Sequence, residues 1–481
     1  MNSLRYGVNL VGHFKAETGL GEGVRATARS LREANVPHTC IDLEDNGSQN
    51  PERFTTVQNG SFPINLIQLN PPTGTDWLFR NSSRCYQIGY WAWEQSLLPP
   101  AWANKIQHFD EIWVPSEFTR DAVKAVTPQP VFRAPHSIST EISMPSWAKS
   151  NWGIPESEFV FINCFDFRSY IERKNPEGLI ESFSKAFSPH DGVTLIIKTN
   201  HGVGRPEFKH LKHQIRSLKN IRILDETLTH AETLAWINAS DAYVSLHRSE
   251  GFGLPLFEAM SLGKPVVATG YSGMMDYLDS SNALLVNFTL KTPLKPHPLY
   301  WENIPWADPD LDHATKQMQL LVENCSLFDD LSLKGKEIVE TQLSARVVGE
   351  RMKHRLMSIA ETINLESVSW QALLPKWSEN RSHTYGRSKA TRYIRRELHG
   401  ANVELQNTIN QLMSDRVSGG KNGENIKRFR TLNETLTNNS QWSWKKQLKS
   451  PLRSLINRLV WPYWTKQKEI NSLLFEALDG E

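Results

Sequence analysis

Two glutamates, Glu250 and Glu258, stand eight positions apart on either side of the tight turn GFGLP at 251–255. The apolar run AYVSLH before them predicts a strand, and the residues after the turn predict a helix that contains Glu258 about one turn from its start. Carboxylates accept hydrogen bonds from paired hydroxyls, and amides at a helix start donate to phosphate oxygens. The pattern therefore suits a polyol that carries a phosphate. Acids that compensate a helix dipole beside an ordinary turn are the structural alternative.

The longer stretch EGFGLPLFEAMSLGKPVVAT resembles the donor-site motif of retaining glycosyltransferases of family 4, which have the two-domain GT-B fold. The resemblance extends over roughly residues 5–360, and the E-x7-E spacing is its most specific part. It implies that Glu258 holds the donor ribose and that Glu250 lies against the transferred sugar. It also implies contacts to sugar and phosphate from the backbone around Gly251, Phe252, Gly253 and Leu254.

Three basic residues, Arg168, Arg173 and Lys174, follow the predicted strand FVFINCF. Members of the family carry an arginine and a lysine there that clamp the donor diphosphate, and the resemblance assigns these roles to Arg168 and Lys174. Arg173 is the alternative to its neighbour Lys174. Because a departing diphosphate gains negative charge in the transition state, fixed cations at this point stabilise that state selectively. A solvated basic loop is the structural alternative.

The glycines of ETGLGEG resemble the glycine-rich loop of the family, whose amides approach the donor phosphates. We expect Gly19, Gly21 and Gly23 to lie in a loop that precedes a helix over VRATARSLREA. The G-x-G-x-G spacing begins about eight residues after the first strand, which excludes the G-x-G-x-x-G of a nicotinamide site. Glycine clusters of this kind are also common in plain turns.

The segment GYWAWEQSLLPP ends a predicted strand of the first domain, so Trp91, Trp93 and Glu94 are expected to face the cleft. Many family members have a histidine-containing segment there, whereas a subset that acts on cell-surface polysaccharides shows a similar W-x-W-E. Tryptophan faces stack on sugars, and Glu94 would orient an acceptor hydroxyl as a catalytic residue. Buried aromatics beside a surface acid are the alternative.

Histidines and a short acidic motif are further candidates. His247 ends the strand that leads into the glutamate turn and is assigned to donor binding. His13 and His136 are further cleft candidates that rank below it, because a lone histidine is more often structural. Asp308 and Asp310 spell D-x-D, the metal motif of the other major glycosyltransferase fold, but they stand at a predicted helix start where capping explains them. We expect no metal and no other cofactor.

The elements that must position these residues form an α/β pattern. Strands alternate with helices from residue 1 to about 145, and the alternation restarts after the polar link SMPSWAKSNWGIPESE. This predicts two doubly wound Rossmann-like domains, an acceptor-side domain over 1–150 and a nucleotide-sugar domain over 151–365. Ligands bind such sheets at the carboxyl ends of the strands, and here these ends would face one cleft.

Composition narrows the class of protein. The chain has 481 residues and a formal net charge of +2, which argues against generic nucleic-acid binding. Its start lacks the plan of a signal peptide, and no apolar run is long enough to span a membrane. The four cysteines show no paired spacing. We therefore expect a cytoplasmic protein.

The remaining residues, 366–481, predict a mainly helical, partly flexible extension. A short heptad seam runs from Ile394 to Leu412, and Gly400 interrupts it. The segment 442–464 combines one leucine-rich helical face with lysines, arginines and flanking tryptophans. This combination is typical of a peripheral anchor on an anionic membrane surface, here the inner face of the cell membrane. A helix that packs on protein is the alternative.

The resulting interpretation is a glycosyltransferase that moves a mannose- or glucose-type hexose from a nucleoside-diphosphate sugar to a glycan or lipid-linked acceptor. The resemblance implies retention of configuration and a place in cell-surface polysaccharide biosynthesis. Two alternatives stay open: a GT-B sugar-nucleotide epimerase, and a non-catalytic sugar-nucleotide-binding assembly protein. The donor base, the sugar and the acceptor are not specified by these patterns.

Overall fold

The computed structural model describes residues 6–43, 50, 52, 54–58, 60–71, 73–81, 85–138, 143–293, 300 and 303–373, with side chains as far as 363. These residues belong to one compact unit, Met1–Arg381. The heptad seam, the segment 442–464 and nearly all of the expected extension lie outside the described residues.

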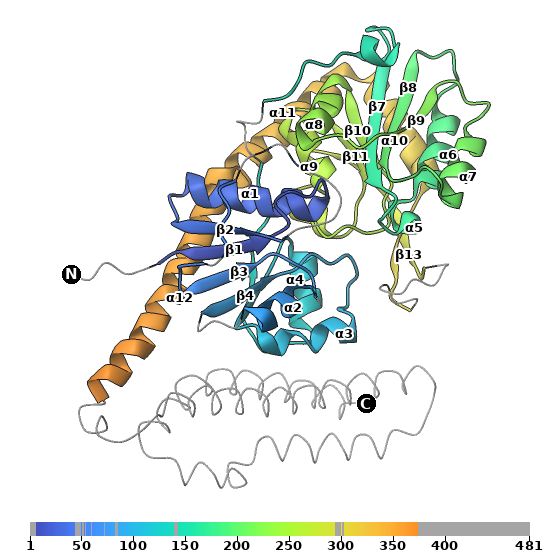
Figure 1. The fold of residues 1–481 in the computed structure, drawn as a ribbon. Coiled ribbons are helices and arrows are strands. Elements are labelled where there is room, and N and C mark those ends of the chain that lie inside the picture. The colour runs from blue at the N-terminus through green and yellow to red at the C-terminus, as the bar shows by residue number, and fades with distance from the viewer. Residues whose placement is uncertain are drawn as a thin grey trace, which may run out of the picture. The chain divides into compact units, whose positions relative to one another are not determined.

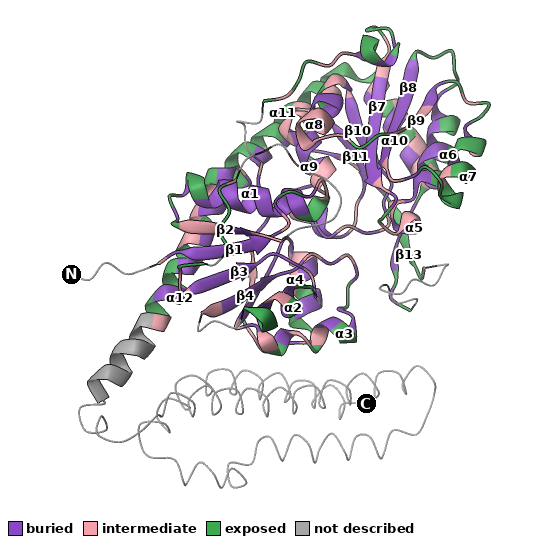
Figure 2. Cartoon of the chain, in the orientation of Figure 1, coloured by how far each residue is buried: buried purple, intermediate pink, exposed green. Residues whose placement is uncertain are grey.

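The first lobe, residues 6–138, is built on a parallel six-stranded sheet in the order β2-β1-β3-β4-β5-β6. Nearly every residue of its central strands is buried, because helices cover the sheet (Figures 1 and 2). The strands are β1 (Val8–Gly12), β2 (His38–Asp42), β3 (Ile64–Ile67), β4 (Tyr86–Tyr90), β5 (Glu111–Val114) and β6 (Val131–Arg133). The helices are α1 (Gly19–Glu33), α2 (Thr73–Arg80), α3 (Pro100–Ala103) and α4 (Glu117–Lys124).

The second lobe, residues 143–342, repeats the plan with the sheet order β12-β11-β10-β7-β8-β9, also parallel. Its strands are β7 (Phe159–Asp166), β8 (Val193–Asn200), β9 (Ile221–Asp225), β10 (Ala242–Ser245), β11 (Val266–Thr269) and β12 (Leu284–Val286). Its helices are α5 (Ile171–Lys174), α6 (Pro176–Ala186), α7 (Pro206–Gln214), α8 (His230–Ala239), α9 (Leu254–Ser261), α10 (Leu311–Glu323) and α11 (Cys325–Gln342). The predicted pair of doubly wound α/β sheets is confirmed.

An antiparallel hairpin, β13 (Phe288–Lys291) with β14 (Trp306–Pro309), stands between β12 and α10. The sequence analysis did not predict it, since proline-rich residues separate its two strands. Asp310 caps α10 directly after β14 by accepting from the amide of His313 at 2.9 Å. Capping, the explanation preferred for this acidic motif, is confirmed for Asp310.

The long helix α12 (Ala345–Leu373) follows the second lobe but packs on α1 of the first lobe (Figure 1). A Cβ added at Gly349 would lie 2.0 Å from the carbonyl oxygen of Ser30, so only glycine permits this approach. Arg355 of α12 donates to the fully buried carboxylate of Glu111. The returning helix therefore links the two lobes.

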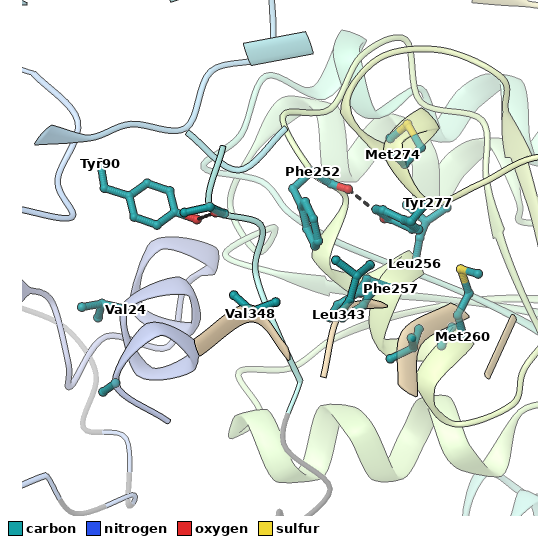
Figure 3. Close-up of a cluster of buried hydrophobic side chains, with 14 of the residues drawn as sticks. Val24, Tyr90, Phe252, Leu256, Phe257, Met260, Met274, Tyr277, Leu343 and Val348 are labelled. Atoms are coloured by element: carbon teal, nitrogen blue, oxygen red, sulfur yellow. Dashed lines mark hydrogen bonds between the residues drawn. The ribbon is translucent and has the colours of Figure 1, made fainter. Parts of the chain in front are cut away.

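One buried apolar cluster extends across both lobes. Figure 3 shows Val24 and Tyr90 of the first lobe, Val348 of α12, and Phe252, Leu256 and Tyr277 of the second lobe in this cluster. Burying such side chains stabilises the association of the lobes by about 25 cal/mol per Å² of apolar surface removed from water. The chain from the first strand to α12 is thus held as one packed body.

Candidate functional site

The glutamate turn lies between β10 and α9 and is pressed against the first lobe. Gly253, the residue directly before α9, has φ +81°, a conformation that favours glycine. A Cβ at Gly251 would lie 2.9 Å from the carbonyl oxygen of Trp93. The hydroxyl of Ser116, at the start of α4, donates to the carbonyl of Gly251 at 2.6 Å. The turn is therefore clamped at the seam between the lobes.

Glu250 is the centre of a buried ionic cluster. Its Oε1 lies 2.5 Å from Nζ of Lys174 and 2.9 Å from Nη1 of Arg173, and its side chain is 12% exposed. Burial alone would raise the pKa of Glu250, but Arg173 and Lys174 outweigh it and hold the pKa at about 2. The carboxylate is therefore ionised at neutral pH, next to two cations that share it.

Arg173 and Lys174 lie on the short helix α5, which is hydrogen-bonded to the loop that carries Glu250. Asn175 ends α5 with φ +52°, and its Nδ2 donates to the carbonyl of Leu246 at 2.9 Å. The guanidinium of Arg173 donates to the carbonyl of Ser249 at 2.7 Å, and the amide of Arg248 donates to the carbonyl of Arg173 at 2.7 Å. Backbone contacts on both sides thus fix where the charges lie.

Arg168 is not part of this cluster. It is exposed, and among the residues that the structure describes its side chain forms no ion pair. Its amide donates to Oδ1 of Asp166 at 2.7 Å, which keeps it in the turn directly after β7. The structure thus brings Arg173 and Lys174 to Glu250 and leaves Arg168 outside, because α5 is needed to carry a side chain from the end of β7 to the glutamate loop.

Glu258 lies within the first turns of α9 and is 5% exposed. Its Oε1 is 2.8 Å from Nε2 of His230, the first residue of α8. The other ring nitrogen of His230 lies 3.2 Å from Oε2 of Glu22, on α1 of the first lobe. Sequence reasoning identified Glu258 but missed His230 and Glu22, and no motif in the sequence connects them.

The three glycines near the N-terminus lie in α1 and not in a loop before it, so the expected helix start was wrong. Thr18 caps the helix by accepting from the amide of Gly21. A Cβ at Gly21 would lie 2.1 Å from the carbonyl of Ala16, and one at Gly23 would lie 2.8 Å from the His136 ring. At Gly19 the nearest atom would be Cδ1 of Leu254, at 3.8 Å, so the starts of α1 and α9 are neighbours.

The two tryptophans of WAWE are both covered by protein. Trp91 is 0% exposed and packs edge-on against Phe109 in the core of the first lobe, so the expectation that it faces a cleft is wrong. Its amide donates to Trp113, which extends the β4 ladder and directs the ring inward. Trp93 is 2% exposed and stacks on Tyr300, with ring centres 5.3 Å apart.

Glu94, in contrast, joins the ionic cluster from the first lobe. Its carboxylate accepts from the hydroxyl of Tyr300 at 3.0 Å and lies 3.8 Å from Nη2 of Arg173. The hydroxyl of Ser249 donates to the backbone carbonyl of Glu94. A residue expected on the acceptor side therefore stands beside the residues expected on the donor side.

The histidines named from the sequence have distinct places. His247 is fully buried beside Ser245, and burial lowers its pKa to about 4. His136 is buried against Tyr90 and Phe252, and burial likewise lowers its pKa to about 4. His13 bonds the carbonyl of Leu43. All three are held by packing or by a hydrogen bond to protein.

These features define the GT-B fold: each lobe contains a parallel six-stranded sheet, the helix α12 returns to the first lobe, and the candidate site lies between the lobes. Solved structures agree. The Anabaena protein Alr3699/HepE, in complex with UDP and glucose, matches with a TM-score of 0.54 and 14% identity over 73% of this chain and 100% of that chain. Sucrose-phosphate synthase from Thermosynechococcus elongatus matches with a TM-score of 0.56 and 15% identity over 74% and 100%. These likenesses establish the fold.

The second lobe is similar to a known protein family. Residues 149–291, which contain both the cation pair and the two glutamates, match the family described as Glycosyl transferases group 1. Over these residues the chain is similar to the group 1 glycosyltransferases, and the resemblance stated from the sequence is confirmed there.

Two curated relatives match over part of their length. The N-acetyl-alpha-D-glucosaminyl L-malate synthase of Bacillus anthracis is 32% identical over 136 residues, 27% of this chain and 32% of the relative. The D-inositol 3-phosphate glycosyltransferase of Arthrobacter sp. (strain FB24) is 26% identical over 166 residues, 32% and 37% of the two chains. The chain thus spans about a third of the length of these relatives.

Proposed function

We propose that this protein transfers a mannose- or glucose-type hexose from a nucleoside-diphosphate sugar to a glycan or lipid-linked acceptor, with retention, in cell-surface polysaccharide biosynthesis. One observation carries the proposal: Glu250 holds Arg173 and Lys174 at the seam, where α9 also presents Glu258. The solved relative that contains UDP and glucose supports a sugar nucleotide as the donor.

In the proposed reaction Arg173 and Lys174 bind the donor diphosphate. The bond between the anomeric carbon and the diphosphate oxygen breaks, and the cations stabilise the charge that develops on that oxygen. The acceptor hydroxyl attacks from the same face and gives its proton to the departing diphosphate. The role first expected of Arg168 passes to Arg173 in this proposal, because Arg173 is the one that contacts Glu250.

The remaining groups orient the donor and the acceptor. Glu258 accepts hydrogen bonds from the ribose, and amides at the neighbouring starts of α1 and α9 approach the phosphates. Glu94 orients the acceptor hydroxyl, and Trp93, which is buried, supports this position from behind by stacking on Tyr300, whose hydroxyl bonds Glu94. Glu250 lies against the transferred sugar once the diphosphate has taken over the two cations.

A screen of nucleotide sugars tests the function. Purified full-length protein is heated with UDP-, GDP- and ADP-glucose and with UDP-galactose, GDP-mannose and UDP-N-acetylglucosamine, and we expect one donor to raise Tm. The stabilising donor, incubated with a membrane glycolipid extract, should release its nucleoside diphosphate and label the extract. Conversion of the donor to an epimer without such release would instead support an epimerase. Binding without turnover would support an assembly protein.

We further propose that the protein contacts the inner face of the cell membrane through residues 442–464. The support is the sequence pattern of this segment, which combines a leucine-rich helical face with basic residues and flanking tryptophans. No helix among the described residues is long and apolar enough to cross a membrane. Replacing Lys445 and Lys446 by glutamate in the full chain should abolish co-sedimentation with vesicles of phosphatidylglycerol and phosphatidylcholine. The matched control replaces the exposed Lys334 and Lys336 of α11 and should leave co-sedimentation intact. Equal binding by both variants would contradict this location.

A further inference from the structure

His230 lies between two carboxylates that come from opposite lobes. Its Nε2 is 2.8 Å from Glu258 and its Nδ1 is 3.2 Å from Glu22. All three side chains are largely buried, with 12% of His230, 8% of Glu22 and 7% of Glu258 exposed. Burying a carboxylate is unfavourable unless a positive charge pairs with it. Glu22 is already paired with Arg25 and Arg29, whereas among the described residues Glu258 is paired with His230 alone.

The imidazolium supplies that charge. Only protonated histidine donates from both ring nitrogens, and both contacts are with carboxylate oxygens. Burial opposes the charged form, but Glu22 and Glu258 outweigh burial and raise the pKa of His230 above its ordinary 6.5. Arg29, which binds Glu22, acts against protonation, and Arg25 also contacts Glu22. The acid on its own helix, Glu232, is engaged with Thr229.

His230 and its first-lobe partner Glu22 are both held in place by neighbouring residues. Thr229 and Glu232 form a capping box that fixes the first turn of α8 and hence the origin of the ring. Arg25 is fully buried and donates to the carbonyls of Phe14 and Ala16 at 2.9 and 2.8 Å, which holds the guanidinium that contacts Glu22. The bridge therefore joins two rigid helix starts rather than two mobile surface side chains.

We infer that His230 is a positioning residue of the donor site, holding one carboxylate oxygen of Glu258 so that the other accepts a ribose hydroxyl. The inference rests on the proposed function, in which Glu258 binds the ribose. Because the same ring contacts Glu22, capture of the ribose is coupled to the pairing of the two lobes. If His230 only joined the two lobes, replacing it would weaken the binding of ribonucleotides and of 2′-deoxyribonucleotides equally.

The test compares ribose with deoxyribose. Full-length protein is titrated calorimetrically with UDP, ADP and GDP and with the 2′-deoxy counterpart of whichever binds. A hydrogen bond to a charged group contributes about 1.5–3 kcal/mol, so the wild type should prefer the ribonucleotide about tenfold to hundredfold. His230→Gln should reduce that preference to threefold or less, roughly, by weakening ribonucleotide binding alone. The matched control is His210→Gln on the exposed face of α7, which should keep the wild-type preference.

The pH dependence provides a second readout. The preference of the wild type should be complete at pH 6 and should decline as the pH rises through the raised pKa of His230, whereas His230→Gln should show no such decline. If His230→Gln does not fold, Glu22→Gln carries the test. Removing one carboxylate lowers the pKa of His230, so the decline should begin at a lower pH.

The outcomes separate the inference from the proposed function. An unchanged ribose preference in His230→Gln, or equal weakening of ribo- and deoxyribonucleotide binding, would overturn the positioning role while the proposed function stands. Failure of the wild type to bind any of the three nucleoside diphosphates would overturn the proposed function and the inference with it.

Discussion

Replacing Lys174 by alanine is expected to lower kcat by about 10²- to 10³-fold while changing the KM for the donor by less than about tenfold. The ammonium lies 2.5 Å from Glu250 at the seam, in a place where a departing diphosphate would collect charge. Burial and the neighbouring Arg173 lower the pKa of Lys174, and Glu250 opposes them. A cation that gains its strongest partner only as the bond breaks affects the transition state more than the bound donor.

Arg168→Ala is the matched control, and initial rates at saturating donor are the measurement. Arg168 is exposed, so its removal is expected to change kcat by less than about threefold. Glu250 keeps Arg173 as a partner in Lys174→Ala, which limits the loss of stability, and Tm should be recorded beside the rates. Full activity of Lys174→Ala, or an equal loss in Arg168→Ala, would refute the assignment of the cluster.

The pH profile of this cluster has a definite sign. The pKa of Glu250 is depressed to about 2 from an ordinary 4.5, so its ion pairs contribute stability that is present above pH 4.5 and lost as the pH falls towards 2. Glu250 therefore stays ionised from pH 5 to 9, and a rate change within that range must come from another group.

The fold was predictable because it depends on repeated local patterns. Short apolar runs that alternate with amphipathic stretches are typical of a parallel sheet covered on both faces, and this pattern occurs twice in the chain. The hairpin β13–β14 was missed because its strands pair across a proline-rich stretch, and β13 is exposed on every residue. A strand without a buried face leaves no periodic apolar signal.

The residues of the site could be predicted where they lie in one short segment. They could not be predicted where the packing of distant elements determines which side chains meet. Glu250 and Glu258 flank one tight turn, so a single short segment of the sequence was enough to identify both. Arg173, and not Arg168, reaches Glu250 because α5 is bonded to the loop that follows β10, and residue order alone does not determine this contact. Trp91 is directed inward by one backbone hydrogen bond of the β4 ladder.

The bridge between Glu22 and Glu258 lies entirely beyond sequence reasoning. It joins residues more than 200 positions apart, and its central member is a lone histidine at a helix start. The role of His230 becomes clear only in the folded protein, where Glu22 of the first lobe contacts the ring nitrogen that faces away from Glu258.

Glu258→Ala is expected to weaken binding of the nucleoside diphosphate by about tenfold to hundredfold, measured by calorimetric titration. The carboxylate is almost fully buried within the first turns of α9, where a hydroxyl donor has little competition from water. Because the ribose is remote from the bond that breaks, kcat at saturating donor should fall by less than about tenfold, so the loss appears mainly in KM.

The control for Glu258→Ala is Glu177→Ala, which removes a glutamate from the first turn of α6 in the same lobe. Glu177 is exposed and its one ion pair among the described residues is with the exposed His210, so nucleotide affinity should not change. Glu258→Ala also leaves His230 with Glu22 alone, and the pKa of His230 should fall because one of its two carboxylates is gone. Glu258→Gln separates the two effects, since its amide oxygen still accepts from the ribose while the charge is lost. If nucleotide affinity is the same in Glu258→Ala as in the wild type, the ribose does not bind at this carboxylate.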